Sequence, residues 1–237
     1  MNVYVLAVER SNSSIGERKS YIRVHQPKLW TILGLRSVEQ KACDRLLLLW
    51  LIREASPLDR YELQKLPFRV EHELDDESKR GFNYEFFQYD DGPISKEAYD
   101  DRDALKELGL ISERGITIRI TPEGEKFLSE FDTMLKKNEA IVNKITEVVN
   151  RLSKMSSSDL VKDTHEMCVV WNSKRIKLSG IPMHSTILAE PDETSIEMDA
   201  SVLETLIVLL NPKLINDMRK VRREGSTSSP YKPFVAI

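Results

Sequence analysis

The stretch FNYEFFQYDDGPI, residues 82–94, decides how this chain folds. Five of the chain's seven Phe and seven Tyr residues lie within positions 82–89. Phe82, Tyr84 and Phe86 alternate with other residues, which is the period of a β-strand with one buried face. We therefore expect these three side chains to form the core face of a strand.

The strand is followed by a turn signal and a helix signal. Asp90, Asp91, Gly92 and Pro93 favour a turn, because Pro93 fixes its own φ and disfavours the α region for Gly92. Ser95 is a good N-cap for the helix that follows. The pair Gly92-Pro93 is thus predicted to place the strand against this helix.

Phe87 and Tyr89 have the opposite parity along the strand. They form either a second packed face or an exposed patch for a partner, and the sequence leaves both possibilities open. A stacking platform for single-stranded nucleic acid would need a basic groove, whereas Asp90 and Asp91 follow directly. Core packing and protein contact are therefore the better interpretations of the aromatic stretch.

Helix signals precede the stretch. Residues 37–40, Ser-Val-Glu-Gln, have the pattern of a capping box and predict a helix to about Ala55. Asp59 caps a second predicted helix, which Pro67 should kink or end early.

Downstream, Gly109 is predicted to end the third helix, and residues 110–120 read as a β-hairpin. Thr121-Pro122 starts another helix with a break near Asn138, and residues 156–171 add one more helix. The order helix, helix, strand, helix, hairpin, helix is that of a winged-helix domain.

The sequence thus predicts a mostly helical α+β protein with a winged-helix-like core. The expected parts are an N-terminal β extension at 1–36, the winged-helix-like domain at 37–175, a linker at 176–198, and a helical tail at 199–237 with a disordered end.

Composition favours a cytoplasmic protein with no membrane span. Of the 237 residues, 41% are hydrophobic and 31% are charged, and the net charge is −3. The apolar run LLLLWLI at 46–52 is far shorter than the roughly 20 residues that a membrane span requires. The two cysteines, Cys43 and Cys168, both lie in helical patterns and suggest buried thiols in a reducing compartment.

No pattern in the sequence indicates catalysis. The four histidines are spread over different predicted elements. His165 and Cys168 lie three positions apart on a predicted helix, but a zinc site needs three or four ligands and no further pair supplies them. We expect a protein that is not an enzyme and that uses neither a metal nor a cofactor.

DNA binding is the main alternative, because winged helices commonly read DNA with the helix before the hairpin. Residues 59–108, which include that helix, hold fifteen acidic and eight basic residues, a net charge of −7. Affinity for DNA rises with each phosphate that the protein neutralises, so an acidic face disfavours this function.

Five short segments occur in an order that a known family shares. They are LQKLPF at 63–68, FNYEFFQYDDGPIS at 82–95, DALKELGLI at 103–111, ITPEGEKFL at 120–128 and SSDLVKDTHEMCVVW at 157–171. Together they resemble the Panacea domain, the SocA-like antitoxin domain of bacterial, archaeal and phage toxin–antitoxin pairs. Pro67 and the Asp90-Asp91 pair depart from the family's usual pattern.

The resemblance implies that the protein neutralises a toxin by direct contact, without catalysis. It assigns structural roles to the aromatic stretch, to Gly92-Pro93 and Ser95, and to His165 and Trp171 in the last segment. The partner-specific part in this family often lies outside the shared domain. The expected partner-binding residues are Phe87, Tyr89, Arg219, Arg222, Tyr231 and Phe234, although an ordinary amphipathic helix and a frayed terminus would explain the last four equally well.

Overall fold

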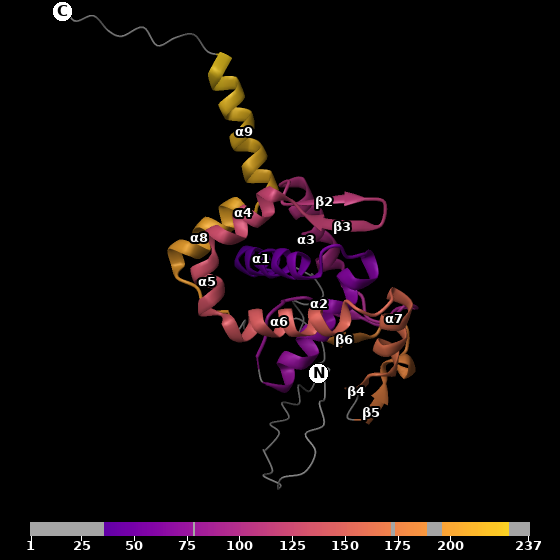
Figure 1. The fold of residues 1–237 in the computed structure, drawn as a ribbon. Helices are drawn as coiled ribbons and strands as arrows, with labels where there is room; N and C mark the ends of the chain where they lie inside the picture. The colour runs from indigo at the N-terminus through magenta and orange to yellow at the C-terminus, as the bar shows by residue number, and fades with distance from the viewer. Residues whose placement is uncertain (1–35, 78, 172–173, 189–195, 228–237) are drawn as a thin grey trace, which may run out of the picture.

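The computed structural model describes residues 36–77, 79–171, 174–188 and 196–227 (Figure 1). The elements are, in chain order, α1 (Val38–Ala55), α2 (Arg60–Asp76), β1 (Phe86–Phe87), α3 (Lys96–Glu107), β2 (Ile111–Arg114), β3 (Thr117–Ile120), α4 (Pro122–Glu130), α5 (Asp132–Lys137), α6 (Glu139–Leu152), α7 (Ser157–Glu166), β4 (Cys168–Trp171), β5 (Lys174–Lys177), the 3₁₀ turn η2 (Leu178–Gly180), β6 (Thr186–Leu188), α8 (Ala200–Leu209) and α9 (Pro212–Thr227). The protein is therefore a mostly helical α+β fold, as the sequence predicts.

Helix α1 is the central element of the core. The expected capping box is present: the Ser37 hydroxyl accepts from the Gln40 N–H, and the Gln40 side chain accepts from the Ser37 N–H. The α1 side chains from Leu46 to Leu49 are all buried, and α3, α6 and α8 pack around the helix (Figure 1). A helix that is apolar on nearly all sides is stable only in such a central position.

Helix α2 continues through Pro67, so of the two predicted effects of this residue, a kink or an early end, the early end does not occur. Proline removes one helical hydrogen bond, but tertiary packing usually outweighs local propensity. Here Leu66, Phe68 and Val70 are fully buried on both sides of the proline. The cap at Asp59 is as expected, with Glu62 completing a second capping box.

The winged-helix order is confirmed from α1 to α4. Strands β2 and β3 form an antiparallel hairpin, and Leu58, between α1 and α2, joins its edge by two backbone hydrogen bonds to Ile118 of 3.1 and 2.8 Å. Gly109 follows α3 with φ of 80°, a left-handed conformation that suits glycine. Thr121 caps α4 with Pro122 in the first turn, as predicted.

The aromatic stretch is buried as expected, but most of it is not a strand. Phe82, Tyr84 and Phe86 are at most 1% exposed, whereas the strand β1 contains only Phe86 and Phe87. Its partner is β6, antiparallel, from within the range predicted as a linker. The burial of the three aromatic side chains is confirmed, but the predicted alternation is not, because Asn83 between Phe82 and Tyr84 is buried as well. The backbone of the residues before β1 is hydrogen-bonded to side chains, as described below.

The second half of the domain has more breaks than predicted: α4 already ends at Glu130, before α5 begins at Asp132. The expected break at Asn138 separates α5 from α6. The helix predicted to extend to residue 171 ends at Glu166, because Met167 has extended backbone angles, and Cys168 and Trp171 lie in β4. β4 pairs with β5, and Trp171 packs against the core while remaining partly exposed.

Helices α8 and α9 form the predicted helical tail. α8 packs on α1, and α9 extends away from the rest of the molecule (Figure 1). Asn211 caps α9: its side-chain oxygen accepts a hydrogen bond from the Leu214 N–H. The predicted N-terminal β extension, apart from Arg36, and the predicted contact residues Tyr231 and Phe234 lie outside the described residues. Among the described residues, no helix is long and apolar enough to cross a membrane.

Candidate functional site

Residues from three separate sequence segments meet behind the turn at Gly92. The Gln64 amide donates to the Ser95 carbonyl at 3.1 Å, and the Gln64 carbonyl accepts from the Ser95 N–H at 2.6 Å. The Lys65 ammonium donates to the Pro93 carbonyl at 3.0 Å. We call this group, completed by Gly92 and by His165 of α7, the motif junction.

His165 reaches the junction from the far end of the domain. A Cβ placed on Gly92 would lie 3.5 Å from His165 Nε2 and 3.7 Å from Lys65 Cε. Gly92 has φ of 87°, which non-glycine residues rarely adopt. The residues with structural roles in the family resemblance, Gly92, Pro93, Ser95 and His165, are therefore neighbours in space. Within this group, Gln64 of the LQKLPF segment binds Ser95, and Lys65 of the same segment binds Pro93.

Lys65 is a buried lysine whose protonated form is disfavoured by burial. Burial lowers its pKa to about 8, while the carboxylate of Asp91 acts in the opposite direction. The residue is 1% exposed, and its ammonium group donates to the backbone carbonyl of Pro93. This lysine fixes the position of the Gly92 turn.

Two further buried carboxylates hold the residues that precede the strand β1. Glu71 of α2 accepts from the Gly81 and Phe82 N–H groups at 3.0 and 2.6 Å. Asp44 of α1 accepts from both the backbone and the side-chain N–H groups of Asn83, at 2.8 and 2.9 Å. Buried backbone groups must find partners, and here side chains replace the neighbouring strand.

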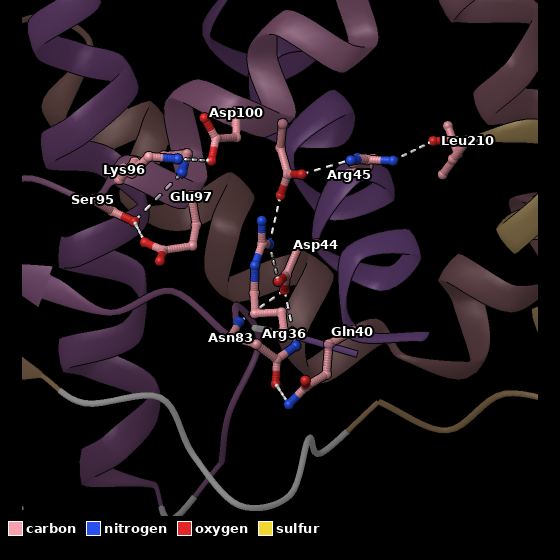
Figure 2. A network of polar contacts seen from close by, with 12 residues as sticks. Arg36, Gln40, Asp44, Arg45, Asn83, Ser95, Lys96, Glu97, Asp100 and Leu210 are labelled. Atoms are coloured by element: carbon pink, nitrogen blue, oxygen red, sulfur yellow. Dashed lines mark hydrogen bonds and ion pairs between the residues drawn. The ribbon is translucent and has the colours of Figure 1, made fainter. Parts of the chain in front are cut away.

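Asp44 also belongs to a buried ionic network between α1 and α3 (Figure 2). One nitrogen of Arg36 lies 2.5 Å from Asp44 and 2.6 Å from Asp101. Arg45 donates to Asp101 at 2.9 Å and to the Leu210 carbonyl at 2.5 Å. The network thus connects Arg36, two residues before α1, and Leu210, at the end of α8, to the winged-helix core.

Burial dominates the electrostatics of both carboxylates. It raises the pKa of Asp44 to about 7, against the opposing effect of the Arg36 guanidinium. It raises the pKa of Glu71 to about 7 as well, although Arg80 and the two backbone N–H groups favour the charged form. Neither group lies in an open cleft, so their burial indicates a structural role.

The expected contact residues Phe87 and Tyr89 differ in exposure. Phe87 is partly buried, because β1 pairs with β6 on one side and bridges to Ile94 on the other. Tyr89 is 42% exposed, and its ring meets the edge of the His184 ring at a centroid distance of 5.4 Å. Met183 is exposed beside His184 in the chain. We call Tyr89, Met183 and His184 the Tyr89 patch.

The Tyr89 patch is supported directly by the motif junction. Tyr89 and Gly92 exchange two backbone hydrogen bonds of 2.9 and 3.2 Å, and His184 donates from its N–H to the Gln88 carbonyl at 2.8 Å. His184 itself has a positive φ of 65°, an uncommon conformation for histidine. The patch is therefore held in a fixed geometry from two sides.

The other expected contact residues lie elsewhere. Arg219 and Arg222 are exposed on α9, which extends from the side of the molecule opposite β6 (Figure 1). The structure does not bring them together with the Tyr89 patch. The prediction that His165 and Cys168 lie on one helix is wrong, because Cys168 lies in β4. Among the described residues, no group of three His, Cys, Asp or Glu side chains could hold a metal ion.

The sequence analysis did not identify the buried acidic residues of the ionic network between α1 and α3. The charge pattern of the sequence does not distinguish Asp44 and Asp101 from surface acids, yet both are fully buried. For Asp44, the position in the sequence could have indicated burial. This residue lies between buried Cys43 and Leu46 on a helix that is apolar on nearly all sides. A charge at such a position predicts an ionic partner.

Comparisons of this chain with protein-family models, with curated proteins and with solved structures find no match.

Proposed function

We propose that this protein is a non-enzymatic, antitoxin-like protein that neutralises a partner toxin by direct protein–protein binding. The observation that carries the proposal is the exposed Tyr89 patch, backed by the motif junction. Tyrosine is enriched among the residues that dominate binding energy in protein interfaces, since its ring offers a large contact area and its hydroxyl a polar group.

The rigidity of the Tyr89 patch supports this function. A contact residue that is already held in its binding geometry loses little conformational entropy when the partner arrives. Tyr89 lies at the start of a turn whose Pro93 carbonyl is bound by Lys65. The polar groups of the motif junction thus hold the exposed Tyr89 patch in place. The segments that form the junction are the same ones that resemble the Panacea domain.

The surface of α3 supports protein contact over DNA contact. The exposed charged side chains of this helix are Lys96, Asp100, Asp103, Lys106 and Glu107. Both lysines lie within 3 Å of a carboxylate, Lys96 of Asp100 and Lys106 of Glu113. A helix that reads the major groove needs cations directed at phosphates, and these cations are already neutralised.

Co-expression with the product of the neighbouring gene tests the proposal. The full-length protein should rescue growth from that product's toxicity, and Tyr89→Ala combined with Met183→Ala should not. Ile116→Ala removes a comparably exposed apolar side chain at the hairpin tip and serves as the control. Truncation after Glu224 separates the tail: if the truncated protein fails to rescue while the Tyr89 variant succeeds, recognition lies in residues 225–237.

Two outcomes would contradict the proposal. If no neighbouring gene product is toxic and affinity purification of the full-length protein recovers no protein partner, toxin neutralisation is excluded. Specific retention of the protein's own promoter DNA in the same experiments would favour a transcriptional regulator.

A further inference from the structure

The outer part of α9 has an apolar stripe that no other described part of the chain covers. Leu214, Met218 and Val221 are 40%, 60% and 68% exposed. Every side chain from Asn216 to Arg222 is exposed, and Figure 1 shows α9 standing away from the helices around α1. Helices of this length are marginal in water without packing, so a covering partner would stabilise the stripe.

The shape of the stripe indicates a helix as the covering element. The three residues are spaced by four and three positions, and at 100° per residue they span an arc of only about 60°. A narrow seam with this spacing is typical of a coiled coil, in which the residues would occupy positions d, a and d. A membrane-surface helix has a wider apolar face, commonly with aromatic residues, and α9 contains none.

The charges beside the seam select the partner and its direction. In this register Asp217 occupies position g and Arg222 occupies position e, on opposite flanks of the seam. In a parallel pair, a g residue faces the e residue five positions later on the other helix. Asp217 of one copy would therefore face Arg222 of the other, and the same pair would form twice by symmetry.

We infer that α9 pairs in parallel with α9 of a second copy of this chain through Leu214, Met218 and Val221. An antiparallel arrangement would place g beside g and bring Asp217 near Asp217, which like charges disfavour. The helix is anchored at its start, where the Asn216 amide donates to Glu107 of α3 at 2.6 Å. The seam remains on a different side of the helix from this contact.

Sedimentation velocity of the full-length protein tests the inference, with circular dichroism to check each fold. We expect the wild type to form a dimer and Met218→Asp to be monomeric at the same concentration. Arg222→Asp and Asp217→Arg should each weaken the dimer about tenfold, since two attractive pairs become repulsive. The double variant Asp217→Arg/Arg222→Asp should restore it, and Arg219→Asp, an equal charge change away from the seam, should leave it unchanged.

Several results would overturn the inference. A wild type that stays monomeric up to about 1 mM would exclude self-pairing of useful strength. A dimer that survives Met218→Asp would use another surface, and a double variant that fails to regain the dimer would exclude the parallel arrangement. A monomeric wild type that sediments with phosphatidylserine vesicles would assign the stripe to a membrane surface. None of these results bears on toxin neutralisation by the Tyr89 patch, so the two proposals can fail separately.

Discussion

Gln64 and Ser95 bind each other twice: the side-chain amide of Gln64 donates to the Ser95 carbonyl at 3.1 Å and its oxygen accepts from the Ser95 N–H at 2.6 Å. Both residues are at most 1% exposed. The pair joins α2 to the start of α3, so it fixes the angle at which the chain leaves the Gly92 turn. The Gln64 side chain thus satisfies both the N–H and the carbonyl group of one buried residue.

Replacing Gln64 by Leu should reduce the free energy of unfolding by about 2–4 kcal/mol, because two buried backbone groups lose their partners. Urea denaturation measures the change. Gln40→Leu, which removes a capping contact near the surface, is the control and should cost about 1 kcal/mol or less. Equal losses in the two variants would show that the Ser95 contacts contribute little.

Replacing both Gly92 and Pro93 by Ala should lower the melting temperature by several degrees. Alanine is strained at the Gly92 φ of 87°, and the turn that holds Tyr89 loses its fixed proline φ. Gly115→Ala has a similar backbone problem, with φ of 62°, at the open hairpin tip. A loss no greater than that of Gly115→Ala would mean that the Gly92 turn does not organise the core.

The stability of the protein should depend on the protonation of Glu71. Burial raises the folded-state pKa of this group to about 7, above its ordinary value of 4.5. The folded state therefore binds more protons than the unfolded state between these values, and the contribution of Glu71 to stability falls as pH rises through this window.

Glu71→Gln keeps an oxygen to accept from Gly81 and Phe82 but cannot ionise. The difference in free energy of unfolding between this variant and the wild type should shift in favour of the variant as pH rises from 4.5 towards 7. The shift should be at most about 1.4 kcal/mol per pH unit. Urea denaturation at a series of pH values measures this difference. Glu73→Gln controls for the loss of one negative charge from the same helix, and parallel profiles for Glu71→Gln and the wild type would contradict the prediction.

Replacing Arg36 by Met should destabilise the protein by about 3–5 kcal/mol, because Asp44 would then have to bind a proton or stay charged and buried without this cation. Lys96→Met removes an exposed cation that lies 2.5 Å from Asp100 and should cost at most about 1 kcal/mol. Thermal unfolding of both variants provides the comparison. Similar small losses would indicate that Arg45 alone compensates the network.

DNA binding should be weak and non-specific. A mobility-shift assay on the protein's own promoter at about 150 mM salt screens non-specific contacts to phosphate. We expect no discrete complex, since the exposed lysines of α3 are paired with carboxylates. A discrete complex that survives competition with unrelated DNA would favour the regulator.

The sequence by itself determined those features that depend on neighbouring residues. The caps at Ser37, Asp59 and Ser95, the left-handed glycine at Gly109 and the break at Asn138 all follow from local hydrogen bonding and backbone sterics, and all are present. The burial of Phe82, Tyr84 and Phe86 was also predictable, because hydrophobic patterning reports which side chains of a segment face the core.

Only the tertiary structure decided what the buried polar residues do. Asp44 and Asp101 are 57 positions apart in the sequence numbering, yet Arg36 joins them, and no local pattern encodes that contact. The short length of β1 has the same origin, since Asp44 and Glu71 satisfy the backbone at residues 81–83 in place of a strand. Long-range partners outweigh local propensity at such sites because a buried polar group without a partner costs more than any single residue's preference for a strand or a helix.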